Sequence, residues 1–150
     1  MIRRWRHLLT DRDGVVAMEF AISASALMLL TLGTIEFGRL LWTQEALNAT
    51  AIQTARCIGV LASSCASGGA YSATNTTSYA ETVASGWGIT LAASDITATN
   101  DQTSGACAGT AQGTFAQVSI AYTFQSVVPG LLTMLSNGEN LTAQACFANQ

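Results

Sequence analysis

The sequence predicts an α+β fold in which a long N-terminal helix packs on a small C-terminal antiparallel β-sheet with a short extra helix. Three observations support this prediction. No charged residue lies between Phe20 and Ile35, and apolar residues continue at helical spacing after Trp42. Toward the C-terminus, apolar residues alternate with polar ones, which is the pattern of half-buried strands.

Composition separates this chain from a soluble globular domain. Of its 150 residues, 49% are hydrophobic and 10% are charged, a charge content that is low for a soluble protein. All six basic residues are arginines, four of which lie in the first twelve positions, and the rest of the chain is acidic. Because this distribution offers no basic surface to phosphates, we expect no nucleic-acid partner.

The segment that follows the arginines is long and apolar enough to cross a bilayer. A helix from Val15 to Trp42 spans about 42 Å, which covers a bilayer and its interfaces. The basic start and acidic remainder place the N-terminus in the cytoplasm, with Trp5 and Trp42 as interfacial anchors. A secretory signal peptide would have a shorter apolar run followed by an A-x-A-like site. We therefore expect a single transmembrane helix.

Glu19 stands near the start of this apolar segment, five residues after Gly14. Gly14 ends the charged leader MIRRWRHLLTDRDG. An acid inside an apolar segment is costly to place in lipid, and it indicates a function with a partner group. The alternative is a glutamate that snorkels at the cytoplasmic interface of a plain anchor.

This junction resembles the type IV prepilin class, in which a membrane peptidase cuts after a glycine on the cytoplasmic side and the fifth mature residue is glutamate. GVVAMEF, IEFGRLLW and, after Gln44, Ala46 and Leu47, TARCIGV are similar to the TadE-like family of minor pilins from tight-adherence (Flp, type IVc) pilus systems. VSIAYTFQSVVPGLL and LTAQACF are similar to that family's strand, proline-containing loop and final strand. The resemblance does not extend to residues 63–113.

The resemblance implies a pilin-like fold and cleavage after Gly14, which leaves Val15 as the new N-terminus with an α-amine of pKa about 7.7 to 8. Glu19, next to Phe20, would then act in assembly by pairing with the Val15 amine of a neighbouring subunit. The implied partners are a prepilin peptidase, other pilins of the system, the inner-membrane pilus assembly machinery and membrane lipid. The implied location is the bacterial inner membrane, with the C-terminal domain exported, and the extracellular pilus.

The helix is expected to continue beyond the membrane. Four apolar residues at helical spacing lie on one face: Leu47, Ala51, Ala55 and Ile58. We therefore divide the chain into a leader (1–14), a transmembrane helix (15–42), its exposed continuation (43–62) and an exported α+β domain (63–150).

A four-residue motif lies where this helix leaves the bilayer: Glu36, Phe37, Gly38 and Arg39. The acid and the arginine are three residues apart, so they either pair locally on the helix surface or contact another subunit.

The exported domain begins with a loop, because residues 63–78 are small and polar. Ser78 and Glu81 fit a capping box and predict a short helix that runs through Ser85 and ends at Gly86. Strands are expected at 95–99 and 115–124, a loop at 100–113, and a helical turn at 131–136. The final strand places four residues on one face: Leu141, Ala143, Ala145 and Phe147.

All four cysteines follow the apolar segment: Cys57, Cys65, Cys107 and Cys146. They form no C-x-x-C pair, and the single histidine precedes the segment, so no metal site is expected. An even number on the exported side favours two disulfides over free thiols. Of three pairings, we favour Cys57 with Cys65, closing a short helix-to-loop segment, and Cys107 with Cys146, tying a loop to the last strand.

Catalysis is not expected. The exported part has no histidine and no carboxylate cluster, and its serines and threonines lack a base to activate them. We therefore predict neither an enzyme nor a cofactor. Two function classes stay open: a minor pilin cut after Gly14 that contributes to pilus assembly or adhesion, and an uncut single-span anchor that carries a small exported binding domain.

Overall fold

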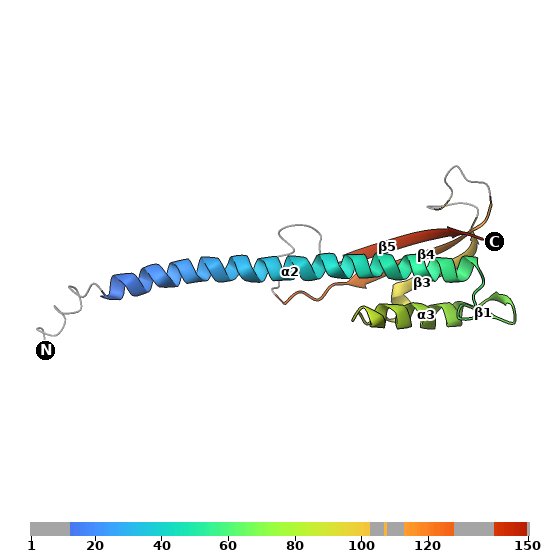
Figure 1. The fold of residues 1–150 in the computed structure, drawn as a ribbon, viewed down its shortest axis with the longest axis horizontal. Coiled ribbons are helices and arrows are strands. Elements are labelled where there is room, and N and C mark those ends of the chain that lie inside the picture. Colours follow the sequence, from blue (N-terminus) through green and yellow to red (C-terminus); the bar gives the residue numbers. More distant parts are fainter. Residues whose placement is uncertain (1–12, 103–106, 108–112, 128–139, 150) are drawn as a thin grey trace, which may run out of the picture. The chain divides into compact units, whose positions relative to one another are not determined.

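The computed structural model describes residues 13–102, 107, 113–127 and 140–149. Along the chain its elements are α2 (Asp13–Gly59), β1 (Ala66–Ser67), β2 (Ala70–Tyr71), α3 (Ala73–Gly86), the 3-10 helix η1 (Ala93–Asp95), β3 (Ile96–Gln102), β4 (Phe115–Thr123) and β5 (Asn140–Ala148) (Figure 1). The long first helix, the antiparallel sheet and the short second helix confirm the predicted α+β class.

The chain divides into two compact units, Met1–Gly38 and Arg39–Gln150, and α2 contributes residues to both. The described part of the first unit is one helical segment. All of its large apolar side chains are exposed, from Leu32 at 51% to Phe20 at 73%. The second unit contains the hydrophobic core.

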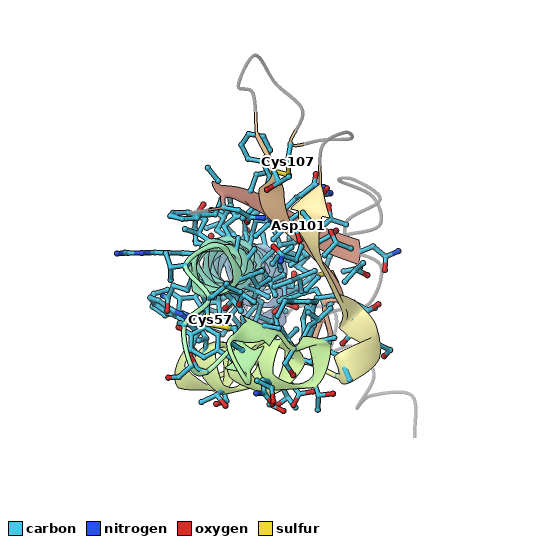
Figure 2. The ribbon with its side chains drawn as sticks, turned by 90° about the vertical axis from the view of Figure 1, so that its right-hand side faces the viewer. Cys57, Asp101 and Cys107 are labelled. Atoms are coloured by element: carbon cyan, nitrogen blue, oxygen red, sulfur yellow. A yellow bond between two sulfur atoms is a disulfide. The ribbon has the colours of Figure 1, made fainter. Side chains whose placement is uncertain are left out.

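In the second unit, α3 and the three-stranded sheet both lie beside α2, and α3 also contacts β3 (Figures 1 and 2). The face predicted from the helical spacing is the buried one, since Leu47, Ala51, Ala55 and Ile58 are each at most 1% exposed. Ala80 and Ala84 of α3 and Val118 and Ile120 of β4 join them in one core cluster. This confirms that the sheet packs on the helix.

Small side chains allow α2 to pack closely in this core. Thr50 and Thr54 are fully buried, and their hydroxyls donate to the carbonyls of Ala46 and Thr50, at 2.8 Å and 2.7 Å. The buried hydroxyls are therefore satisfied within the helix. Gln44 Nε2 donates to the carbonyl of Thr142 at 2.9 Å and links α2 to β5.

The sheet has the order β3-β4-β5, and both neighbouring pairs are antiparallel. Ile120 in the middle strand lies opposite Ile96 on one side and Ala143 on the other. Alternate residues of β4 and β5 are buried, as the sequence alternation predicts.

The start of α3 corrects the sequence prediction. The helix begins at Ala73 with Ser72 as its N-cap, whose hydroxyl accepts the backbone N–H of Asn75 at 3.4 Å. Asn75 Nδ2 also donates to the carbonyl of Ala66 at 2.8 Å, which ties the first turn of α3 to β1. Ser78 therefore lies inside the helix and caps nothing. The end at Gly86 is as predicted.

Two loop predictions were also too broad. The segment read as a loop before α3 contains the hairpin β1–β2, closed by Gly68 and Gly69 with φ of 61° and 83°, values that glycine adopts readily. The strand expected at 95–99 extends to Gln102, with a register shift between Thr99 and Gln102. Asp101 sits in this irregularity with φ of 58°.

The helix α2 ends at Gly59, slightly before the expected position. Leu61 adopts φ of 49°, and the backbone N–H of Ala62 donates to the carbonyl of Cys57 at 3.0 Å. This left-handed turn satisfies a carbonyl at the helix end. The predicted helical turn at 131–136 and the leader up to residue 12 lie outside the described residues.

Candidate functional site

The first unit presents an apolar helix surface that carries a carboxylate near its start. Val15 and Glu19 are four residues apart, so they lie on the same side of α2. Both are exposed, and so is Phe20. A Cβ added at Gly14 would meet no atom within 4 Å, so the packing of the described chain does not require glycine there.

This helix has the length and composition of a membrane span. Its most apolar 18-residue window has a mean hydropathy of 2.0, and none of that window is buried. Within the described residues it is the one helix that meets these criteria. Apolar side chains exposed over such a length are stable only in lipid or against other apolar helices.

The second predicted motif divides into buried and exposed residues. Glu36 is only 3% exposed, whereas Phe37 is 53% exposed and Gly38 has open space around it. The guanidinium carbon of Arg39 lies 5.4 Å from the centroid of the Phe124 ring, a cation–π contact. A buried carboxylate requires a partner group. The pairing of Glu36 with Arg39 stays a prediction.

Two disulfides brace the second unit, and they pair the cysteines as the sequence spacing favours. Cys57 near the end of α2 bonds Cys65, the residue before β1, and Cys107 bonds Cys146 of β5. Figure 2 shows Cys57 on the α3 side of the unit and Cys107 on the sheet side. Both bonds constrain the unfolded chain, which matters for a small domain.

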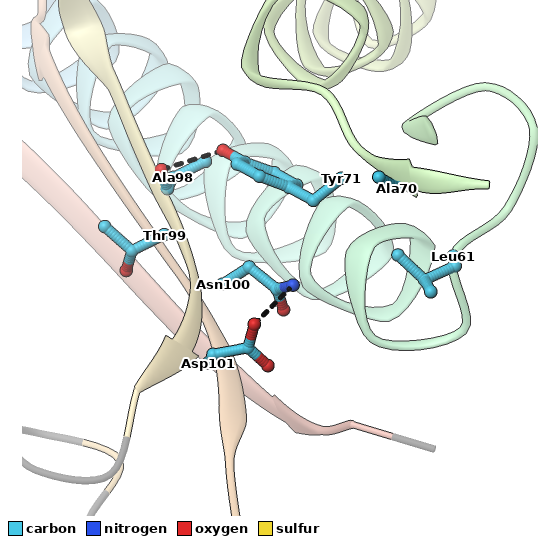
Figure 3. Close-up of a pocket in the computed structure, with 7 residues that line it drawn as sticks. All are labelled: Leu61, Ala70, Tyr71, Ala98, Thr99, Asn100 and Asp101. Atoms are coloured by element: carbon cyan, nitrogen blue, oxygen red, sulfur yellow. Dashed lines mark hydrogen bonds between the residues drawn. The ribbon is translucent and has the colours of Figure 1, made fainter. Parts of the chain in front are cut away.

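An open pocket that sequence reasoning missed lies at the end of β3. Its cavity of about 650 Å³ is lined by Leu61, Ala70, Tyr71, Ala98, Thr99, Asn100 and Asp101 (Figure 3). The Tyr71 hydroxyl donates to the carbonyl of Ala98 at 2.9 Å. Burial raises the pKa of this hydroxyl, while a hydrogen bond with Thr76 acts in the opposite direction. No local sequence signal marks the pocket, because hairpin β1–β2 and the β3 irregularity create it together.

This pocket has no arrangement that performs chemistry. Asn100 Nδ2 donates to Asp101 Oδ2 at 3.2 Å, so its polar groups partly satisfy each other. No nucleophile with an adjacent base lies among its lining residues. Among the residues that the structure describes, no cluster of three or more histidine, cysteine or acidic side chains could hold a metal ion.

These features define a class of protein: an apolar helix with an exposed surface, followed along the chain by a small α+β domain with two disulfides. This layout fits a pilin. Residues 14–56 match the model of the TadE-like protein family, which confirms the resemblance carried by the N-terminal helix. The match associates the chain with the tight-adherence pilus, in a family that is structural rather than catalytic.

The match starts at Gly14 and ends three residues before α2 does. The match therefore covers most of α2. The sheet, α3 and all four cysteines of the two disulfides lie after the matched residues. No curated protein and no solved structure matches the chain.

Proposed function

We propose that this chain is a minor pilin of a tight-adherence (type IVc) pilus, cut after Gly14 by a prepilin peptidase and contributing to pilus assembly or adhesion. The observation that carries the proposal is the family match, which begins at Gly14 and covers the apolar helix. The open space around Gly14 supports it. A glycine that packing does not require, and that helix propensity disfavours, suits a position read by a peptidase.

The apolar surface of the first unit has two successive environments in this proposal. Before assembly the helix spans the inner membrane, with its N-terminus in the cytoplasm and the disulfide-bonded domain exported. During assembly the machinery of the inner membrane transfers the helix from lipid to a bundle of other pilin helices. Both environments are apolar, so the exposed side chains stay out of water throughout.

Glu19 acts in the second environment. Cleavage leaves a charged amine on Val15, about 6 Å along the helix axis from Glu19. In a staggered bundle, the Glu19 carboxylate of one subunit pairs with the Val15 amine of its neighbour, and each charge offsets the desolvation of the other. Removing one partner leaves an unpaired buried charge, which is destabilising by about 3–5 kcal/mol.

The cleavage step is tested by the N-terminal residue and intact mass of the chain from cells with and without the prepilin peptidase. We expect a start at Val15 that requires the peptidase. A start at Met1 in both strains would refute the minor-pilin proposal. It would leave the other function class, an uncut anchor that carries an exported binding domain.

The assembly step is tested with Glu19→Ala and a matched control, Glu45→Ala. Glu45 is an exposed glutamate of the same helix, outside the apolar run. We expect Glu19→Ala to insert and be cut normally but to reduce the number of pili strongly, whereas Glu45→Ala keeps them. Normal piliation in Glu19→Ala would eliminate the charge pairing while leaving cleavage intact.

A further inference from the structure

Two tryptophans that are distant in sequence meet in the second unit. Trp42 belongs to α2, and Trp87 directly follows the last residue of α3. Their ring centroids are 5.8 Å apart and the rings are inclined by 66°. This edge-to-face arrangement is favourable for aromatic rings.

Packing does not bury this tryptophan pair, Trp42 and Trp87. Trp42 is 60% exposed and Trp87 is 40% exposed. Every other aromatic side chain among the described residues of the second unit is partly or fully buried. Two large indoles left on the surface are therefore an exception that the fold of the monomer does not explain.

The position of Trp42 identifies what covers the pair. Trp42 closes the apolar run that starts at Val15, and the helical length of that run, about 42 Å, equals a bilayer with its headgroup layers. An indole at such a point lies among the lipid headgroups, where its apolar ring and polar N–H are both accommodated.

We propose that Trp42 and Trp87 together hold the exported domain on the headgroup layer of the outward-facing leaflet. Because Trp87 is 5.8 Å from Trp42, it enters the same layer. The domain packs on α2 and tilts with it, so Trp42 alone would set the depth of this helix but not its tilt. Trp87 provides a second contact from a different helix, so the pair restricts that tilt before assembly.

The local structure holds Trp87 in place for this contact. Its backbone N–H donates to the carbonyl of Ala84 at 3.0 Å. Gly88 follows with φ of 78°, which allows Ile89 to return to the core, where it is 6% exposed. The indole is thus positioned by a helix end that is anchored on both sides.

The inference rests on the membrane span that the proposed function includes, and not on cleavage after Gly14. The test uses the full chain in phosphatidylcholine vesicles, with and without dibrominated acyl chains that quench tryptophan emission. Trp5→Phe with Trp42→Phe leaves Trp87 as the single reporter and keeps an aromatic partner. Trp5→Phe with Trp87→Phe leaves Trp42. The matched control replaces all three tryptophans by Phe and adds Ile52→Trp.

Ile52 suits the control because it is 60% exposed, like Trp42, and belongs to the same helix. It lies ten residues further along, or about 15 Å, beyond the headgroup layer. We expect brominated lipid to quench Trp87 and Trp42 to similar extents, and to leave the tryptophan at position 52 unquenched.

Flotation of the vesicles after an alkaline wash reports the membrane span separately. A chain that floats but whose Trp87 is quenched only by aqueous acrylamide would overturn the inference and leave the span intact. Trp87 shielded from both quenchers, to a degree that rises with the protein-to-lipid ratio, would instead indicate a contact with a second copy and overturn it as well. A chain that does not float would refute the span and the inference together.

Discussion

At Gly59 the helix α2 lies close to the end of β5, and this position offers a sharp test of the packing. A Cβ at this position would lie 2.5 Å from Phe147 Cδ1 and 3.1 Å from the carbonyl oxygen of Ala148. The Phe147 ring is only half-buried and can shift. The carbonyl belongs to the β4–β5 ladder, where Ala148 pairs with Phe115, and cannot move without disturbing it.

The magnitude follows from two opposing terms. Overpacking of this kind destabilises by about 1–3 kcal/mol. Replacing a helical glycine by alanine stabilises the helix by about 0.5–1 kcal/mol. We therefore expect Gly59→Ala to lower the free energy of unfolding of the second unit by about 1–2 kcal/mol. For a domain of this size, 1 kcal/mol corresponds to roughly 4 °C in Tm.

The assay is denaturant unfolding of the full chain in detergent with both disulfides intact. Gly86→Ala is the control, since Gly86 ends α3 as Gly59 ends α2 and a Cβ there meets nothing within 4 Å. Because only the helix-propensity term applies there, we expect Gly86→Ala to leave the unfolding free energy unchanged or to raise it by up to about 1 kcal/mol. Equal free energies of unfolding for the two variants would refute the reasoning. They would show that the Phe147 ring and the end of β5 can shift to make room for the Cβ without destabilising the fold.

Two further predictions concern the pocket and α3. Tyr71 holds its proton more tightly in the folded chain, since burial raises its pKa above the ordinary value of about 10. The protonated Tyr71 therefore stabilises the folded chain below about pH 10, and this contribution is lost as the pH rises further. The unfolding free energy should decline less at alkaline pH in Tyr71→Phe than in the unchanged chain. An equal decline in both would contradict this prediction. Ser72→Ala should lower the unfolding free energy by about 1 kcal/mol, and Ser78→Ala by less than about 0.5 kcal/mol, in the same denaturation assay. Equal losses would contradict the observed N-cap.

Elements with a strong local period were predictable. The buried face of α2 follows from apolar residues at helical spacing, and β4 and β5 follow from strict alternation. The start of α3 was not predictable in this way, because S-x-x-E at Ser78 is the stronger local signal. The structure places the start earlier because Asn75 reaches Ala66 of β1, a contact that no pattern within the helix contains.

The same distinction applies to the sites. Two features can be recognised from the sequence because they involve consecutive residues on one helix. They are the spacing of Gly14 and Glu19 and the apolar run that follows. The pocket beside Tyr71 combines a hairpin with a strand irregularity. The buried state of Glu36 likewise depends on what surrounds it, which helical spacing cannot specify.

The sequence by itself determined the apolar helix, its charge asymmetry, the two strands with clear alternation and the supply of four cysteines after the apolar segment. Each depends on neighbours within a few residues, where the helical and strand periods act. Only the tertiary structure decided that Trp87 meets Trp42 across 45 positions of the chain. That contact requires α3 to pack on the sheet and end beside α2, and burial of the shared core, rather than any local preference, sets this arrangement.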